Sequence, residues 1–304
     1  MPSSSLDIDQ LERELTKHPD RKFVDNLISG FRQGVYPGFQ ELPTESLLCK
    51  NNLSAIKNAK SVDELLQKEV DKGYIIGPLE QIPFDVYRIN PISLADKKYA
   101  DPPKPRLVVD YSAPHDDEGH FSLNDLISKE EFSLTYTKID EAIKIIQEYG
   151  PRSWLCKTDL TDAFKQIMVH PTVWPYQGIR WRGKYYFFTR LVFGCRSSPK
   201  IFDQLSLALV WIAKNNYGID VLLHLLDDFL AIDKPDVDAD RTMAILTLIL
   251  NKLKIPYSLR KTVGPVFSLE YLGLILDTAN MLCKLPDDKI VRMKKNDHRF
   301  LRES

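Results

Sequence analysis

The feature that most constrains this chain is a pair of adjacent aspartates, Asp227 and Asp228, inside an otherwise apolar run from Leu222 to Ile232. The apolar segments on either side have the length and composition of short β-strands, so the pair is predicted to lie at or beside a hairpin turn. Two neighbouring anions buried without partners would each cost several kcal/mol. They are therefore expected to face a cleft or a cation, although an Asp-Asp pair also occurs in ordinary surface turns.

Length and composition indicate a globular protein. The chain has 304 residues, of which 43% are hydrophobic and 27% charged, enough for one large or two smaller cores. No apolar run approaches the roughly 18–20 residues needed to span a bilayer. The N-terminus has neither the basic start nor the hydrophobic core of a signal peptide. The sequence therefore predicts an intracellular protein, in the cytoplasm or the nucleus, with no membrane partner and no signal for an oligomeric state.

The cysteines point away from a zinc site. The chain has four, and none of them are in a CxxC spacing: Cys49, Cys156, Cys195 and Cys283. This scatter favours free thiols in a reducing compartment.

The charge of the chain is unevenly distributed. The formal net charge is only −1, yet residues 151–200 hold nine Lys/Arg against two Asp, a local net charge of +7. The same stretch carries seven Trp, Tyr and Phe residues between 174 and 188. Basic and aromatic side chains together suit a phosphate backbone and stacked bases. The alternative is a solvated charged face over a half-buried sheet.

Periodicity and turn residues predict a mixed α and β chain. Residues 1–70 are polar and have the composition of helices. Helices are expected over residues 138–149, 200–215 and 241–253, the second with Ser198 as N-cap and Pro199 at its first position. Strands are expected over residues 107–111, 154–160, 179–192 (two strands around Arg182-Gly183-Lys184), 258–263 and 268–276 (a hairpin).

If the strand ending at Asp159 shares a sheet with the Asp227–Asp228 hairpin, three carboxylates come close together. They would repel one another unless divalent cations lie between them, and oxygen-only ligands suit Mg²⁺. Two such ions about 3.5–4 Å apart would support an in-line phosphoryl transfer. The basic side chains of Lys104, Arg106 and Lys261 could hold a triphosphate.

Three motifs then appear in the order of the palm motifs of reverse transcriptases. They are residues 157–164 (KTDLTDAF), 191–202 (LVFGCRSSPKIF) and 225–228 (LLDD). Residues 106–111 (RLVVDY) resemble the fingers motif that precedes them, and residues 260–261 and 270–273 (EYLG) resemble the two that follow. The resemblance covers roughly residues 74–283. Within the family the chain is most similar to retrotransposons of the DIRS (tyrosine-recombinase) type, through residues 77–78, 122–125, 181–186, 276–278 and 285–289.

The resemblance implies a set of catalytic and substrate-binding roles. Asp159, Asp227 and Asp228 would be the catalytic residues and the ligands of two Mg²⁺ ions, with Mn²⁺ as a possible substitute. Phe164 would lie under the sugar and exclude a 2′-hydroxyl, although a ring here is also an ordinary core residue. Nucleotide-binding positions would be Lys104, Arg106, Leu160, Thr161, Asp162, Ala163, Phe164 and Lys261, the last as a general acid toward pyrophosphate. Template and primer positions would be Phe193, Gly194, Ser198 and Pro199.

Two positions depart from the family pattern. Leu225 stands where the acid-pair motif usually begins with Tyr or Phe, and Val192 stands where Pro is common. Since the chain ends at Ser304, we expect it to include no ribonuclease H domain and only the start of a thumb.

The resemblance implies an α+β right-hand polymerase, with an antiparallel sheet backed by helices. The predicted domains are a helical N-terminal extension (1–73), fingers and palm (74–283) and the start of a thumb or connection (284–304). The expected reaction is that of an RNA-directed DNA polymerase, a nucleotidyltransferase that adds deoxynucleotides to a primer 3′-hydroxyl on an RNA or DNA template. The alternatives are a catalytically inactive nucleic-acid-binding relic, an RNA polymerase of the viral right-hand type, and a protein-interaction domain with a chance Asp-Asp turn.

Overall fold

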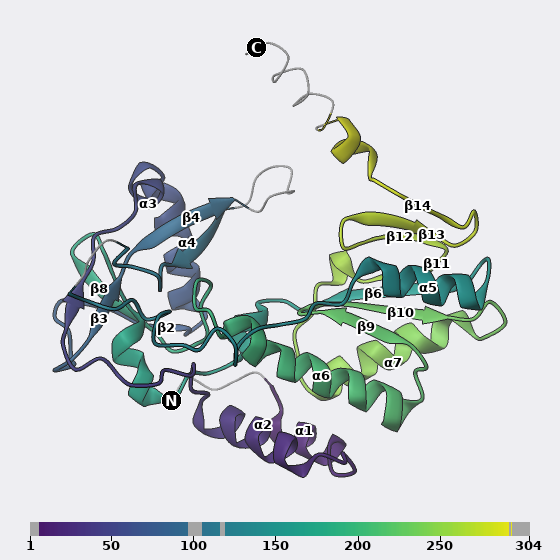
Figure 1. Ribbon diagram of the computed structural model, residues 1–304, viewed down its shortest axis with the longest axis horizontal. Helices are drawn as coiled ribbons and strands as arrows, with labels where there is room; N and C mark the ends of the chain where they lie inside the picture. Colours follow the sequence, from purple (N-terminus) through teal and green to yellow (C-terminus); the bar gives the residue numbers. More distant parts are fainter. Residues whose placement is uncertain (1–5, 97–104, 116–118, 292, 294–304) are drawn as a thin grey trace. The chain divides into compact units, whose positions relative to one another are not determined.

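A computed structural model describes residues 6–96, 105–115, 119–291 and 293 (Figure 1). The chain divides into two compact units, each built from two segments of the sequence. The first unit comprises residues 1–134 and 162–205, and the second comprises residues 135–161 and 206–304. Both mix helices and strands, as expected for an α+β fold. No helix within the described ranges is both long and apolar enough to cross a membrane.

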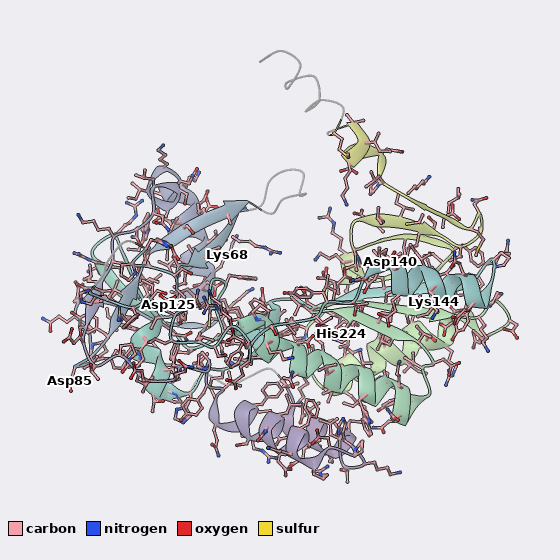
Figure 2. The ribbon with its side chains drawn as sticks, in the orientation of Figure 1. Lys68, Asp85, Asp125, Asp140, Lys144 and His224 are labelled. Atoms are coloured by element: carbon pink, nitrogen blue, oxygen red, sulfur yellow. The ribbon has the colours of Figure 1, made fainter. Side chains whose placement is uncertain are left out.

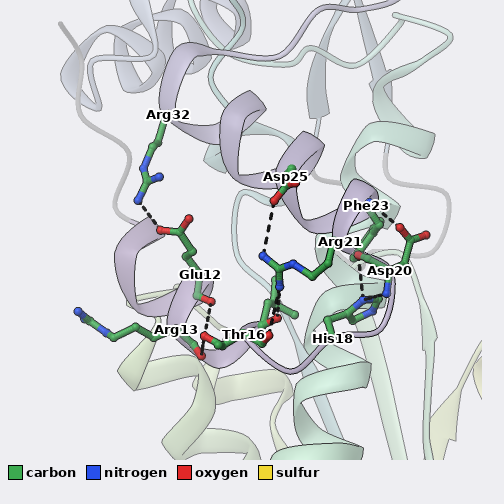
Figure 3. Close-up of polar contacts among 10 residues, drawn as sticks. Glu12, Arg13, Thr16, His18, Asp20, Arg21, Phe23, Asp25 and Arg32 are labelled. Carbon is green, nitrogen blue, oxygen red and sulfur yellow. Dashed lines mark hydrogen bonds and ion pairs between the residues drawn. The ribbon is translucent and has the colours of Figure 1, made fainter.

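The first unit begins with a helical hairpin, α1 (Ile8–Glu14) and α2 (Arg21–Gln33). Asp20 caps α2 by accepting a hydrogen bond from the N–H of Phe23 at 2.8 Å. The apolar face of α2 is buried at positions spaced by three and four residues: Val24, Leu27, Ile28 and Phe31. Arg32 forms ion pairs of 2.7 Å with Asp9 and Glu12, and so links the two helices on their exposed side. Figure 3 shows the pair with Glu12.

The rest of the first unit contains two sheets and short helices. The larger sheet has the strand order β1-β3-β7-β8-β2, parallel between β1, β3 and β7 and antiparallel elsewhere, and the smaller is the hairpin β4-β5. The strands of the first unit are β1 (Leu47–Leu48), β2 (Ile75–Leu79), β3 (Arg88–Asn90), β4 (Ile92–Asp96), β5 (Pro105–Val109), β7 (Gly178–Trp181) and β8 (Lys184–Phe188). Its further helices are α3 (Leu53–Lys57), α4 (Ala59–Asp71) and the 3-10 helices η1 (Ala163–Gln166) and η2 (Pro171–Gln177).

The predicted hairpin around residues 182–184 is confirmed, although its loop holds only Arg182 and Gly183 and Lys184 already belongs to β8. Trp181 pairs with Lys184 across β7 and β8, and the two loop residues Arg182 and Gly183 have φ of 50° and 78°. Positive φ at both loop residues is the requirement of a type I′ turn, which matches the twist of the strands it joins.

The second unit is built on the antiparallel sheet β11-β6-β10-β9 and a three-stranded sheet β12-β13-β14. Its strands are β6 (Trp154–Asp159), β9 (Leu222–Leu225), β10 (Asp228–Asp233), β11 (Val263–Val266), β12 (Ser268–Tyr271), β13 (Leu274–Asp277) and β14 (Leu282–Lys284). Its helices are α5 (Ile139–Tyr149), α6 (Ser198–Tyr217, which begins in the first unit), α7 (Ala239–Lys252) and the 3-10 helix η3 (Leu259–Lys261).

The period of two along β6 and β10 assigns their side chains to opposite faces of this sheet. On one face Leu155, Leu230 and Ile232 pack against α5 and the β12-β13 hairpin. On the other, Thr158 and Phe229 line a small apolar space together with residues of α6 and α7. Figure 1 shows helices over both faces, so the expected sheet backed by helices is present.

Two local predictions were wrong. Residues 258–263 do not form a strand: the N–H groups of Lys261 and Thr262 donate to the carbonyl of Ser258, which closes the tight turn η3, and β11 begins only at Val263. The hydroxyl of Ser198 donates to the carbonyl of Val192 at 2.9 Å, and α6 already begins at this residue. Ser198 therefore braces the preceding loop with its side chain.

Candidate active site

The predicted carboxylates meet at one end of the β6-β10 pair. Asp228, the first residue of β10, lies opposite Asp159, the last residue of β6, in the antiparallel register. Asp227 precedes Asp228 in the turn between β9 and β10. Since Asp159 and Asp228 are directly opposed, their side chains emerge on the same face of the sheet. The structure thus places all three acids at one edge of the sheet, as the sequence predicted.

The turn that carries the acids is a two-residue loop, because Leu225 pairs with Asp228. Leu226, the first loop residue, has φ of 54°. The carbonyl of Asp227 accepts a hydrogen bond of 2.9 Å from the N–H of Leu160, the residue after the strand that ends in Asp159. This bond ties the Asp159 segment and the Asp227 segment together through the backbone.

Two lysines lie on the opposed carboxylates. Lys261 Nζ lies 2.6 Å from Asp159 Oδ2, and Lys157 Nζ lies 3.2 Å from Asp228 Oδ2. Lys157 and Asp228 are both about four-fifths buried, whereas the Lys261 side chain is 43% exposed. The sequence predicted Lys261 as a site residue that contacts phosphate. In the structure its ammonium forms an ion pair with the carboxylate of Asp159. Lys157 was missed, although its place two residues before Asp159 puts it on the same strand face.

Burial dominates the electrostatics of the second acid. It raises the pKa of Asp228 to about 6, and the nearby negative charges of Asp159 and Asp227 act in the same direction while Lys157 opposes them. Asp228 Oδ1 is buried and has no hydrogen-bond partner in the described chain. An anionic oxygen in this position would be stabilised by a further cation.

The carboxylates suit a hard divalent cation by chemistry, since they are oxygen ligands with one unsatisfied oxygen. Across the residues that the structure describes, however, no group of three or more His, Cys, Asp or Glu side chains is arranged to hold a metal ion. The lysine ammoniums are the cations that contact Asp159 and Asp228 here. The two-ion Mg²⁺ site therefore stays a prediction.

The backbone after Asp159 is engaged within the chain. Leu160 N–H donates to Asp227, and Thr161 N–H donates to the carbonyl of Pro256 at 2.8 Å. Leu160 itself is buried, with 2% of its surface exposed. These bonds hold the segment that leads from the acid strand into the next turn.

Three of the remaining predicted residues, Phe164, Phe193 and Arg106, form an aromatic and cationic cluster in the first unit together with Phe202, which was not predicted as a site residue. The ring of Phe164 lies 4.9 Å from that of Phe193 and 5.8 Å from that of Phe202, and the Arg106 guanidinium lies 5.3 Å from the Phe193 ring. Phe164 is 8% exposed, so it is a core ring by burial, and its role against a 2′-hydroxyl stays a prediction. Ala163, its neighbour, is half-buried at the start of η1.

The loop of Phe193 and Gly194 is held by a residue that sequence reasoning missed as a site residue. Asn124 donates from Nδ2 to the carbonyl of Gly194 and accepts from the N–H of Arg196, at 2.9 and 2.8 Å. Arg196 in turn donates from its guanidinium to the carbonyls of Asn124 and Ile127. Pro199, half-buried, follows Ser198 at the start of α6. Only the resemblance of residues 122–125 drew attention to this position.

Asp162 is the residue at which the chain returns to the first unit. Its φ of 52° places it in the left-handed region. Its carboxylate forms an ion pair with Lys72, which follows the end of α4. Lys104, the remaining predicted nucleotide-binding residue, lies outside the described residues.

Several basic residues of the 151–200 stretch have acidic partners in the chain. Ion pairs join Lys157 to Asp228, Lys165 to Glu69, Arg182 to Asp63 and Lys184 to Glu80. Arg190 is buried, at 2% exposure. Part of the local positive charge is therefore neutralised internally, which leaves fewer cations of this stretch to meet a phosphate backbone.

The chain is similar to known proteins in structure but matches none by sequence. No protein-family model matches the chain, and no curated protein matches it. Among solved structures it is similar to the foamy viral protease-reverse transcriptase in complex with double-stranded DNA, at 16% identity and a TM-score of 0.59, over 93% of this chain and 48% of that one.

The same foamy viral protein in complex with an RNA/DNA hybrid matches at 16% identity and a TM-score of 0.59, over 93% of this chain and 37% of that chain. The native prototype foamy virus enzyme matches at 19% identity and a TM-score of 0.55, over 90% and 34%. The chain thus spans about half, or less, of the length of these solved chains. At these identities the likeness concerns the fold: this chain has the α+β polymerase fold of a reverse transcriptase, with a palm and fingers.

Proposed function

We propose that this protein is an RNA-directed DNA polymerase of a retroelement, a nucleotidyltransferase that extends a primer along an RNA or DNA template. The observation that carries the proposal is the opposition of Asp159 and Asp228 at the end of β6 and β10, with Asp227 in the adjoining turn. The similarity to solved reverse transcriptases that bind double-stranded DNA and an RNA/DNA hybrid supports it. The DIRS-type placement belongs to the proposal and rests on the sequence motifs alone.

In the proposed reaction the primer 3′-hydroxyl transfers its proton to solvent water, and its oxygen attacks the α-phosphorus of a deoxynucleoside triphosphate. The bond to the β-phosphate oxygen breaks, and pyrophosphate leaves. Asp159, Asp227 and Asp228 would hold two Mg²⁺ ions. When bound, these ions lower the pKa of the attacking hydroxyl and neutralise charge on the phosphates.

The chain's own residues would bind the substrates. Arg106 and Lys104 would contact the triphosphate, and Phe164 would select deoxynucleotides through the cluster that holds its ring against Phe193. Lys261 would exchange Asp159 for the leaving pyrophosphate, since its ammonium is exposed enough to reach solvent. Phe193, Gly194, Ser198 and Pro199 would contact the template and the nascent base pair.

A second candidate is a nucleic-acid-binding protein of the same fold without catalysis. Two observations favour it: lysine ammoniums contact Asp159 and Asp228, and an aliphatic Leu225 begins the acid-pair motif. Such a protein would bind primer–template in a salt-sensitive way and extend nothing.

The test is primer extension on an RNA template annealed to a DNA primer, with Mg²⁺ and deoxynucleotides. The chain is compared with Asp159→Asn, Asp227→Asn and Asp140→Asn, the last a matched control because Asp140 is an exposed carboxylate on α5 in the same unit (Figure 2). Parallel reactions contain a chelator or ribonucleotides. Binding of the same primer–template is measured at two salt concentrations.

Extension by the wild type and by Asp140→Asn, lost in both active-site variants and on chelation, is the expected result. Equal use of ribonucleotides would favour an RNA polymerase. Binding without extension would favour the second candidate. Undiminished extension by Asp227→Asn would refute the assigned role of the acid pair.

A further inference from the structure

Lys157 makes two contacts that connect different parts of the second unit. Its Nζ lies 3.2 Å from Asp228 Oδ2 and donates a hydrogen bond of 3.0 Å to the backbone carbonyl of Glu270 in β12. The ammonium also lies 5.9 Å from the centre of the Tyr271 ring. One cation thus joins Asp228, the second acid of the pair, to a strand 113 residues further along the chain.

The surroundings of Lys157 make these contacts hard to replace with water. The side chains of Lys157 and Asp228 are 18% and 21% exposed, and Tyr271 is fully buried. A carboxylate and an ammonium that are largely removed from water interact more strongly than an exposed pair, and the loss of one partner leaves the other charge uncompensated. Lys157 therefore restrains Asp228 strongly.

The other end of the connection is also fixed. Tyr271 pairs with Leu274 across the β12-β13 hairpin, and its loop residues Leu272 and Gly273 have φ of 47° and 85°, as in a type I′ turn. Lys289 forms a 2.8 Å ion pair with the carboxylate of Glu270 and donates a 2.7 Å hydrogen bond to the carbonyl of Gly273. The Lys289 side chain is only 15% exposed. Glu270 is thus held through its carbonyl by one lysine and through its carboxylate by another.

We propose that Lys157 is a positioning residue that anchors the Asp228 carboxylate to the β12-β13 hairpin, and that Lys289 stabilises this anchor from the hairpin side. The catalytic geometry at Asp228 then depends on the position of a hairpin that carries none of the three acids. This inference rests on the proposed function for its catalytic consequence. The anchoring itself concerns the chain alone and is tested without a substrate.

The physical reason is that the catalytic rate depends steeply on small displacements of the reacting groups. Displacement of a reacting group by about 1 Å can cost on the order of 100-fold in rate. A carboxylate on an edge turn, beside two other anions, is pushed away from them unless a cation restrains it. Lys157 supplies that restraint from the same face of the sheet, and its second bond to Glu270 fixes where the cation itself lies.

The experiment compares Lys157→Met, Lys157→Arg and Lys289→Met with the wild type. The matched control is Lys144→Met, because Lys144 is a 77% exposed lysine on α5 of the same unit (Figure 2). Hydrogen exchange is measured for the peptides covering β9-β10 and β12-β13. Steady-state kcat and KM for deoxynucleotides are measured with active-site titration, so that unfolded protein does not enter kcat.

We expect Lys157→Met to speed exchange in both hairpins and to lower kcat on the order of 10- to 100-fold with KM within about twofold. Lys157→Arg should restore most of kcat, and Lys289→Met should give a smaller change in the same direction. Lys144→Met should change neither readout. If Lys157→Met does not fold, the Lys289→Met result decides in its place.

Two results would overturn the inference: a kcat for Lys157→Met equal to that of Lys144→Met, or unchanged exchange in β12-β13. A failure of the proposed function would give a different experimental result. In that case the wild type extends no primer, and the exchange data alone decide whether Lys157 anchors the two hairpins.

Discussion

The hydroxyl of Ser206, in the middle of α6, donates a hydrogen bond of 2.8 Å to the carbonyl of Leu226, the residue that precedes the acid pair. Ser206 is completely buried. The helix behind the sheet therefore supports the loop residue whose positive φ shapes the acid-bearing turn.

Replacement of Ser206 by Ala should lower the free energy of unfolding by about 1–2 kcal/mol, because a buried carbonyl loses its donor. Primer extension should fall as well, since Leu226 adjoins Asp227. The matched control is Thr247→Ala, which removes a hydroxyl bonded to the backbone of the partly exposed helix α7 and should cost less than about 0.5 kcal/mol. Chemical denaturation measures both, and equal losses would contradict the support assigned to Ser206.

Leu226 tests the backbone of the same turn. A φ of 54° is uncommon for a residue with a Cβ and worst for a β-branched one. Leu226→Gly should leave the free energy of unfolding within about 1 kcal/mol of the wild type, because relief of strain offsets the added chain entropy. Leu226→Val should destabilise by about 1–2 kcal/mol. A valine variant as stable as the glycine variant would show that the turn has no need of positive φ.

Gly194 tests the loop that Asn124 holds. A Cβ at Gly194 would lie 1.9 Å from the carbonyl oxygen of Val109, and the residue has φ of +107°. Gly194→Ala should therefore destabilise by more than about 3 kcal/mol. Gly183→Ala is the control: its φ is also positive, at +78°, but a Cβ there meets nothing within 4 Å, so about 1 kcal/mol is expected. Thermal unfolding would separate the two, and similar losses would contradict the close contact.

The cysteines give a prediction that depends on pH. Burial raises the pKa of Cys156 to about 12 and also raises that of Cys195, whereas Cys283 is exposed. Only the thiolate reacts with thiol reagents, and at pH 8 a pKa of 12 leaves about one thiolate in 10⁴. In the native protein Cys283 should be labelled rapidly, and Cys156 and Cys195 only after denaturant is added. Peptide mapping with a Cys283→Ser control measures this, and native labelling of Cys156 at the Cys283 rate would be inconsistent with its burial.

Local sequence determined the backbone conformation of most elements near the site. The apolar runs around Asp227 and Asp228 predicted the β9-β10 hairpin, and Arg182-Gly183 predicted the turn between β7 and β8. The helix expected over residues 138–149 is α5, which ends before Gly150 at a φ of 88°. These predictions succeed because apolar periodicity and turn chemistry act between residues a few positions apart. The strand prediction over residues 258–263 was wrong because hydrogen bonds to the carbonyl of Ser258 form a tight turn in spite of the strand-like composition.

Sequence also placed Asp159 and the acid pair in one motif order, and the register of β6 and β10 agrees with that order. It did not reveal which cations contact them. Lys261 and Asp159 are 102 residues apart, and Lys157 reaches a carbonyl 113 residues away. Ser206 supports the acid-bearing turn and Asn124 supports the loop of Phe193 and Gly194, and their sequence positions did not indicate either contact.

There is a physical reason why the sequence predicts local structure but not the partners of the charged residues. Strand period, caps and positive-φ turns are properties of short segments, so the chain's own order of residues determines them. The partners of a buried charge depend on which segments pack against it, and only the tertiary structure decides that Lys157 lies between Asp228 and Glu270.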